Sequence, residues 1–217
     1  MRIKACEEVE DGLVVSQVHV DTGLSESSQT KEHKGNTKDD VCFLNTSDGM
    51  LLAACSNGLY RYNEQDSLFV PFLLDKEKPH VRYFAEDGDK TLWIDTNKGL
   101  MRYSLEKKQF VSLPTLIQPF TQQCNNAVLI SSNQLLFNTN NDFFVYHIQS
   151  NTLCNLSKDL EVKDFRCAAT DHTGNIWVGT EYGIFVFNKL YQLIAHYEQS
   201  ERDLSALNDS PIYSLYQ

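Results

Sequence analysis

Two arginines are candidates for a shared binding site because of their spacing. Arg82 and Arg166 are 84 residues apart, which is also the separation of Gly99 and Gly183. A guanidinium group presents several donors in one plane and pairs with carboxylates. If the common separation reflects a structural repeat, the two side chains start from equivalent places in the fold.

The other chemically reactive residue types show no catalytic or metal-binding arrangement. The six cysteines include no CxxC motif, and the histidines include no HExxH motif. No GxSxG motif, close carboxylate pair or phosphate-binding glycine loop is present. The segment DHTGN at 171–175 has too few carboxylates for a calcium loop. We therefore predict no catalytic residue, no metal site and no cofactor.

Charge and hydropathy limit the classes of partner. The chain has 217 residues, with 19 basic and 29 acidic side chains and a formal net charge of −10. This is the wrong sign for holding phosphates, so nucleic acid is not an expected partner. No apolar stretch approaches the roughly 20 residues that cross a bilayer, and the N-terminus lacks the apolar core of a signal peptide. We therefore expect a soluble segment, which is either cytoplasmic or part of a longer chain whose export signal lies upstream.

A hairpin pattern supplies the elements that would position the arginines. The stretch 170–188 reads TDHTGNIWVGTEYGIFVFN, with two short apolar runs between turn clusters. Such runs predict two antiparallel strands joined by a tight connection. Because neither run alternates with polar residues, both faces of the hairpin should be covered by protein.

The same pattern recurs along the chain. The hairpin position of Gly183 is filled by Gly58, Gly99 and Asp142 in the other copies, at steps of 41, 43 and 41 residues. Large apolar residues stand six positions before this anchor (Leu52, Trp93, Leu136, Trp177) and four positions after it (Tyr62, Tyr103, Tyr146, Phe187). A period of about 40 to 45 residues with about four short strands is the length of one propeller blade.

The predicted fold is therefore an all-β propeller of four-stranded antiparallel blades. The blades are expected at about 41–72, 81–113, 127–156 and 165–197, with the first strand of a next blade at 212–217. Residues 1–40 are expected to hold a partial preceding blade and a polar loop, and 41–217 the repeats. Four blades with two fragments do not close, so we expect an arc of a larger, seven-bladed ring that is marginally stable or self-associating alone.

Two cysteines share one repeat position. Cys42 and Cys167 stand at the same distance from Gly58 and Gly183, which favours small buried core residues. A bridge between Cys42 and Cys55 across a hairpin is the alternative.

At 171–188, and more loosely at 86–104, the chain resembles the two-component regulator propeller repeat. Seven residues match that repeat: Asp171, Gly174, Trp177, Gly179, Thr180, Gly183 and Asn188. The second copy has Asp95 for the Gly after Trp, and the first has Leu52 for Trp. The resemblance implies the periplasmic sensor region of a hybrid two-component histidine kinase, and many such regions are associated with oligosaccharides released from polysaccharides.

The resemblance also indicates where a ligand would bind. In propellers of this pattern the first strand of each blade lines the channel, and the ligand face includes the connections between the second and third strands. The predicted ligand-binding residues are those at the first-strand starts (Arg82, Arg166 and Tyr213) and those in the connections (Asn57, Lys98 and Tyr182). They could hydrogen-bond sugar hydroxyls or pair with a carboxylated sugar. The alternative is that each arginine pairs with an acidic residue of a neighbouring blade.

The leading hypothesis is a non-catalytic, periplasmic, ligand-sensing segment of a hybrid sensor histidine kinase that responds to an oligosaccharide and signals to transcription. Its expected partners are that ligand, further blades and a membrane-anchored kinase in the parent chain, and a second copy in a homodimer. One alternative is a propeller interaction scaffold without a small-molecule ligand. Another is a lyase or hydrolase with a histidine assembled from distant blades.

Overall fold

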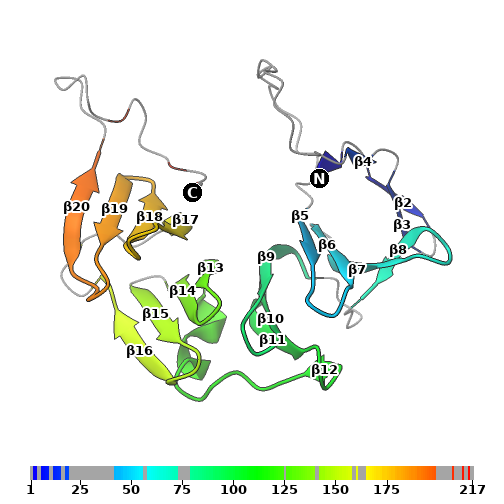
Figure 1. Cartoon of the computed structure of the whole chain (residues 1–217), viewed down its shortest axis with the longest axis horizontal. Coiled ribbons are helices and arrows are strands. Elements are labelled where there is room, and N and C mark those ends of the chain that lie inside the picture. The colour runs from blue at the N-terminus through cyan, green and yellow to red at the C-terminus, as the bar shows by residue number, and fades with distance from the viewer. Residues whose placement is uncertain are drawn as a thin grey trace. The chain divides into compact units, whose positions relative to one another are not determined.

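The computed structural model describes residues 2–3, 6–9, 12–15, 18–19, 42–55, 58–72, 79–124, 126–139, 142–157, 160, 165–198, 207, 212 and 215. The chain divides into two compact units, Met1–Val81 and Arg82–Gln217. Every regular element except one short 3-10 helix is a β-strand in this described part of the chain (Figure 1). None of the described helical residues forms a span long and apolar enough to cross a membrane.

The first unit contains a six-stranded sheet and a separate two-stranded sheet. Its strands are β1 (Arg2–Ile3), β2 (Cys6–Val9), β3 (Gly12–Val15), β4 (Val18–His19), β5 (Cys42–Asn45), β6 (Leu51–Cys55), β7 (Gly58–Asn63) and β8 (Leu68–Pro71). Strands β5 to β8 form a four-stranded antiparallel meander, and β1 pairs with β4. The β2–β3 hairpin extends the meander beyond β8, with Leu13 opposite Phe69. The N-terminal hairpin therefore adds to the sheet of the first repeat.

The second unit contains three four-stranded antiparallel sheets (Figure 1). Their strands, in chain order, are β9 (Val81–Glu86), β10 (Thr91–Thr96), β11 (Gly99–Ser104) and β12 (Gln109–Phe110); β13 (Asn126–Ser131), β14 (Gln134–Asn138), β15 (Phe143–His147) and β16 (Thr152–Asn155); and β17 (Phe165–Thr170), β18 (Ile176–Thr180), β19 (Gly183–Phe187) and β20 (Leu193–Tyr197). A 3-10 helix, η1 (Gln118–Gln123), connects the first sheet to the second. The predicted all-β class is confirmed, and each of the four repeats forms a four-stranded antiparallel meander, which β2 and β3 extend in the first repeat.

Each sheet of the second unit packs face to face on the next. Trp93 and Leu100 of the first sheet share a buried cluster with Leu135 and Phe137 of the second. The opposite face of the second sheet, with Leu136 and Val145, shares a cluster with the β17–β20 sheet through Phe165, Val178 and Phe185. Both faces of the middle sheet are covered by protein, which explains why its strands are continuous apolar runs.

The turn between the first and second strands is fastened to the tryptophan of the motif. Asp87 accepts hydrogen bonds from the backbone N–H groups of Asp89 and Thr91, both at 2.9 Å. Its second oxygen accepts the indole N–H of Trp93 at 2.7 Å. The spacing of six residues between Asp and Trp therefore joins a turn to a buried ring.

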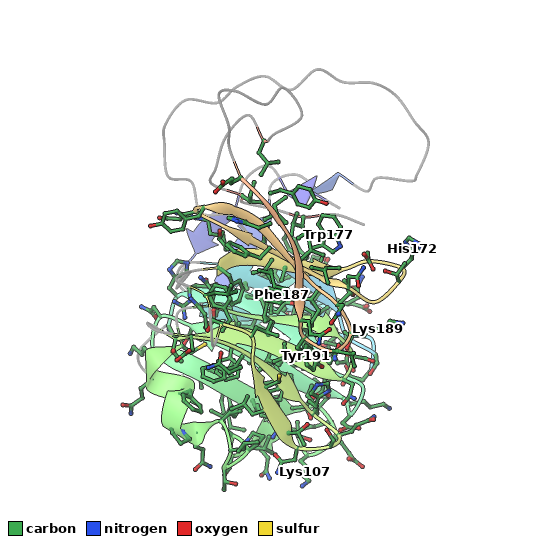
Figure 2. The ribbon with its side chains drawn as sticks, turned by 90° about the vertical axis from the view of Figure 1, so that its left-hand side faces the viewer. Lys107, His172, Trp177, Phe187, Lys189 and Tyr191 are labelled. Carbon is green, nitrogen blue, oxygen red and sulfur yellow. The ribbon has the colours of Figure 1, made fainter. Side chains whose placement is uncertain are left out.

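The fourth repeat has the same arrangement around Asp171. Its carboxylate accepts from the backbone of Thr173 and Asn175 and from the indole of Trp177 at 2.9 Å. Figure 2 shows Trp177 near the turn that carries His172. Hydrogen bonds from Thr173 and Trp177 hold the pKa of Asp171 well below its usual range.

The divergent third repeat keeps the same hairpin without a glycine. Thr139 donates its backbone N–H to the carbonyl of Asp142 at 2.9 Å. The carboxylate of Asp142 accepts from Asn155 at 2.9 Å and from Ser157 at 3.1 Å. Asp142 thus replaces the glycine with a polar link to the segment after β16.

At Gly99 a side chain would not fit the hairpin. Its φ is +109°, a conformation that L-residues rarely adopt, and a Cβ atom would lie 2.6 Å from the carbonyl oxygen of Thr121. Gly183 has φ +110° and is equally crowded, by the carbonyl of Tyr197. The anchor glycines are therefore required by the backbone and by close packing.

Candidate ligand-binding surface

Arg82 lies at the start of β9 and is held by three groups. Its Nη2 donates to Asp95 Oδ1 at 2.6 Å, to the carbonyl of Thr96 at 2.8 Å and to the carbonyl of Cys124 at 3.2 Å. The other oxygen of Asp95 accepts the backbone N–H of Ala127 at 3.3 Å. Since Cys124 and Ala127 belong to the start of the next sheet, the Arg82–Asp95 pair joins the first and second sheets of this unit.

Asp95 stands where the fourth repeat has Gly179 and is 1% exposed. Burial raises its pKa to about 6, and the adjacent Arg82 offsets part of that rise. A carboxylate in this place can reach the backbone of the next sheet, which glycine cannot. The departure from the motif at Asp95 therefore has a structural reason.

Arg166 occupies the equivalent place in the fourth sheet but is more open. It lies at a register shift of β17 between Phe165 and Cys167, and it forms an ion pair with Glu181 in the β18–β19 connection. Their side chains are 35% and 47% exposed. Ion pairs this exposed contribute about 0 to 1 kcal/mol to the stability of the fold. A ligand that replaces either partner therefore loses little of its binding free energy in breaking the pair.

The acidic partners come from the same sheet as each arginine. Asp95 is on β10, next to β9, and Glu181 follows β18, next to β17. The alternative of ion pairs with a neighbouring blade therefore does not describe these contacts. Among the described residues, Arg82 contacts the segment that leads into the following sheet through the carbonyl of Cys124.

The two described connections have matching geometry. The backbone N–H of Lys98 donates to Thr96 Oγ1 at 3.1 Å, and that of Tyr182 donates to Thr180 Oγ1 at 3.0 Å. Tyr182 is 62% exposed. Its carbonyl is 3.1 Å from Nε2 of His196 on β20. The tyrosine ring is thus presented to solvent from a fixed turn.

The structure places the predicted residues in two groups. Arg166 and Tyr182 lie at one end of the β17–β20 sheet, together with Glu181, which was not predicted, and Arg82 and Lys98 lie at the corresponding end of the β9–β12 sheet. The β13–β16 sheet packs between these two sheets and separates the groups. Asn57 and Tyr213 are outside the described residues.

A second set of residues links the sheets at one repeat position. The hydroxyl of Tyr83 accepts the backbone N–H of Leu129 at 3.2 Å. At the same position of the third repeat, Asn126 Nδ2 donates to the carbonyl oxygen of Phe165 at 2.8 Å. In the fourth repeat, Cys167 Sγ lies 3.5 Å from the carbonyl oxygen of Ile212. The repeat register placed Cys42 and Cys167 together, and the same alignment could have found Tyr83 and Asn126.

The cysteines show no bridge among the described residues. Cys124, Cys154 and Cys167 are free thiols. Cys42 is opposite Ala54 in the β5–β6 pairing, so Cys55 is not its cross-strand neighbour. Within the described part of the chain no three His, Cys, Asp or Glu side chains are grouped so as to hold a metal ion.

Comparisons with known proteins are informative at the level of the fold. No known protein family matches the sequence, and no curated protein matches it. The family suggested by the motif is therefore not shown at the sequence level. Solved structures do match, and this chain covers only 25% of the length of the first of them.

Two examples are extracellular domains from B. thetaiotaomicron. One is the extracellular domain of the "putative one component system BT4673", with 19% identity, a TM-score of 0.64 and 84% of this chain covered. The other is that of the "putative hybrid two component system BT3049", with 22% identity, a TM-score of 0.56, and 71% of this chain and 22% of that one covered. At these identities the likeness shows the fold.

An enzyme shares the fold as well. Virginiamycin B lyase from Staphylococcus aureus matches with 15% identity and a TM-score of 0.53, over 75% of this chain and 56% of its own. This chain is thus built of propeller sheets that resemble extracellular domains of two-component systems. The fold by itself does not separate binding from catalysis.

Proposed function

We propose that this chain is a ligand-binding part of an extracytoplasmic sensor that responds to an oligosaccharide. In the parent protein, further blades and a membrane-anchored histidine kinase would pass the signal to transcription. The observation that carries the proposal is the exposed group Arg166, Glu181 and Tyr182 on a fold shared with the two B. thetaiotaomicron extracellular domains.

The chemistry of this group suits a sugar. The exposed ring of Tyr182 offers a flat apolar surface for the C–H face of a pyranose, and its hydroxyl can exchange hydrogen bonds. Arg166 and Glu181 provide donors and acceptors for neighbouring hydroxyl groups. Arg166 can also leave Glu181 and pair with the carboxylate of a uronic acid.

The test is isothermal titration calorimetry of this chain with neutral and uronic-acid-containing oligosaccharides. Tyr182→Ala and Arg166→Gln should each weaken binding by about tenfold, since each removes one main contact. Phe110→Ala is the matched control, because Phe110 is a similarly exposed ring on β12. The proposal fails if no oligosaccharide binds, or if both variants bind as tightly as the unchanged chain.

A protein-interaction scaffold is the second candidate, and a specific surface favours it. The last sheet exposes four large apolar side chains on β20 and just before it: Leu190, Leu193, Ile194 and Tyr197. Apolar residues gathered on an outer strand are typical of protein-binding surfaces. A chain that binds no glycan but captures a defined protein, and loses it with Ile194→Lys, would support this candidate.

A further inference from the structure

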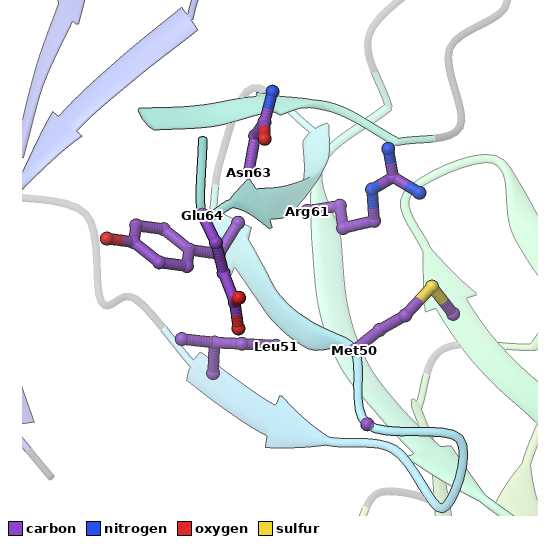
Figure 3. A pocket seen from close by; sticks show the side chains of 7 residues that line it. Met50, Leu51, Arg61, Asn63 and Glu64 are labelled. Atoms are coloured by element: carbon purple, nitrogen blue, oxygen red, sulfur yellow. The ribbon is translucent and has the colours of Figure 1, made fainter. Parts of the chain in front are cut away.

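The first repeat contains a pocket at one end of its sheet. It has a volume of about 240 Å³ and lies where β6 begins and β7 ends, lined by Gly49, Met50, Leu51, Arg61, Tyr62, Asn63 and Glu64 (Figure 3). All of these residues belong to the first unit. Pockets for drug-sized ligands measure about 300 to 1,000 Å³, so this one suits a smaller molecule.

The repeat register explains why the pocket is open. Six positions after the anchor, the second repeat has Leu105, which is 4% exposed and whose N–H bonds the carbonyl of Lys90 at 3.0 Å. The third repeat has Ile148 in this place, packed against a core cluster. In the first repeat the residue is Glu64, an exposed carboxylate that cannot fill the same space.

The fourth repeat closes the same place in another way. Lys189 follows β19, and its aliphatic chain lies over Gly174, where an added Cβ would be 2.5 Å from Lys189 Cε. Figure 2 shows Lys189 beside the turn that carries His172. In the first repeat the glycine equivalent to Gly174 is Gly49, and nothing lies within 4 Å of its added Cβ. A small residue is thus retained there without the side chain that covers it elsewhere.

Arg61 has also lost the role of its counterpart. In the second repeat, the Arg102 guanidinium lies 4.6 Å from the ring centre of Trp93. The first repeat has Leu52 in place of that tryptophan. Arg61 and Glu64 are exposed, and neither has an ion-pair partner among the described residues. Two opposite charges therefore face a pocket without neutralising each other.

One wall of the pocket is fixed. The ring of Tyr62 packs against Phe69, with centroids 5.2 Å apart, and both Tyr62 and Leu51 pack on the core cluster of the first unit. In Figure 3 the Glu64 carboxylate points to the side of Leu51, whereas Arg61 extends to the side of Met50. The two charges therefore extend toward different sides of the pocket.

We infer that this pocket binds a small zwitterion whose ammonium and carboxylate groups are separated by an aliphatic spacer. The ammonium pairs with Glu64 beside the Tyr62 ring, where cation–π attraction adds to the ion pair. The carboxylate pairs with Arg61, and the spacer lies over Leu51 and Met50. The site is independent of the oligosaccharide surface, which lies in the second unit.

The experiment titrates the ¹⁵N-labelled chain with glycine, 4-aminobutyrate and 6-aminohexanoate, and with pentylamine and pentanoate as single-charge controls. The longer zwitterions are expected to shift the backbone signals of 49–51 and 61–64, and to bind about tenfold more tightly than either single-charge compound. Glycine should bind weakly because its charges are too close together.

Variants separate the site from general ion binding. Glu64→Leu, which restores the residue of the second repeat, should abolish the shifts, and Arg61→Gln should weaken binding by about tenfold. Glu106→Leu removes an exposed carboxylate from the β11–β12 turn and should leave binding unchanged. Unchanged binding by Glu64→Leu, equal binding of pentylamine, or no shift with any zwitterion would each overturn the inference.

Discussion

Replacing Asp87 by alanine should destabilise the second unit strongly. Asp87 is 5% exposed, and its carboxylate accepts two backbone N–H groups and the indole N–H of Trp93. Hydrogen bonds to a charged group contribute about 1.5 to 3 kcal/mol each, and burying the carboxylate offsets part of that sum. We expect a loss of about 3 to 5 kcal/mol in the free energy of unfolding.

The assay is urea denaturation followed by far-UV circular dichroism, because the chain has only two tryptophans and the cycle removes one. A double-mutant cycle of Asp87→Ala with Trp93→Phe isolates the carboxylate–indole bond, with an expected coupling of about 1 to 2 kcal/mol. Asp171→Ala is the control and should cost less, because Asp171 and Trp177 are more exposed. A loss below about 1 kcal/mol, or no coupling, would refute the structural role of this bond.

Three further outcomes are expected. Gly99→Ala should lower the free energy of unfolding by about 2 to 4 kcal/mol, because of the positive φ and the contact with Thr121. Gly88→Ala is the control and should lower it much less, because its added Cβ makes an ordinary contact; the two urea midpoints give the comparison. Because the pKa of Asp95 is raised to about 6, protonation of Asp95 stabilises the fold fully below its ordinary value of 3.8, and this stabilisation is lost as pH rises through 6, by about 3 kcal/mol in all. About 2 kcal/mol of this loss falls between pH 4.5 and 7, so parallel denaturation at these two pH values should show it in the unchanged chain and not in Asp95→Asn. Burial raises the pKa of the Cys124 thiol to about 12, so it should resist Ellman's reagent at pH 8 in the folded chain and react in urea; fast reaction when folded would contradict its burial.

The sheets were predictable because their pattern depends on local sequence. The spacing of Gly58, Gly99 and Gly183 reflects a backbone conformation that recurs once per repeat, and short β-branched runs on either side form the strands. Even the copy with Asp142 could be aligned, since its flanking apolar positions are retained. The addition of β2 and β3 to the edge of β8 could not be predicted, because a single strand contact over more than 50 residues leaves no periodic signal.

The site was predictable only in part. The 84-residue separation predicted that Arg82 and Arg166 lie at equivalent positions in their repeats, but it did not predict their ion-pair partners. In the motif Asp95 is only a departure from glycine, whereas in the structure it is the ion-pair partner that links two sheets. Glu181 precedes Tyr182 in the connection, and only the bulge at Arg166 brings the guanidinium to it. Pairings of this kind depend on side-chain direction, which spacing does not determine.

The links at Tyr83, Asn126 and Cys167 have a consequence for how the repeats can change over time. Each side chain meets a backbone group of the following segment, at Leu129, Phe165 or Ile212. A main-chain partner is present whatever residue stands there, so a substitution in one repeat does not require a matching substitution in its neighbour. The third repeat could therefore lose its tryptophan and its glycine while its junctions with both adjoining sheets stayed intact.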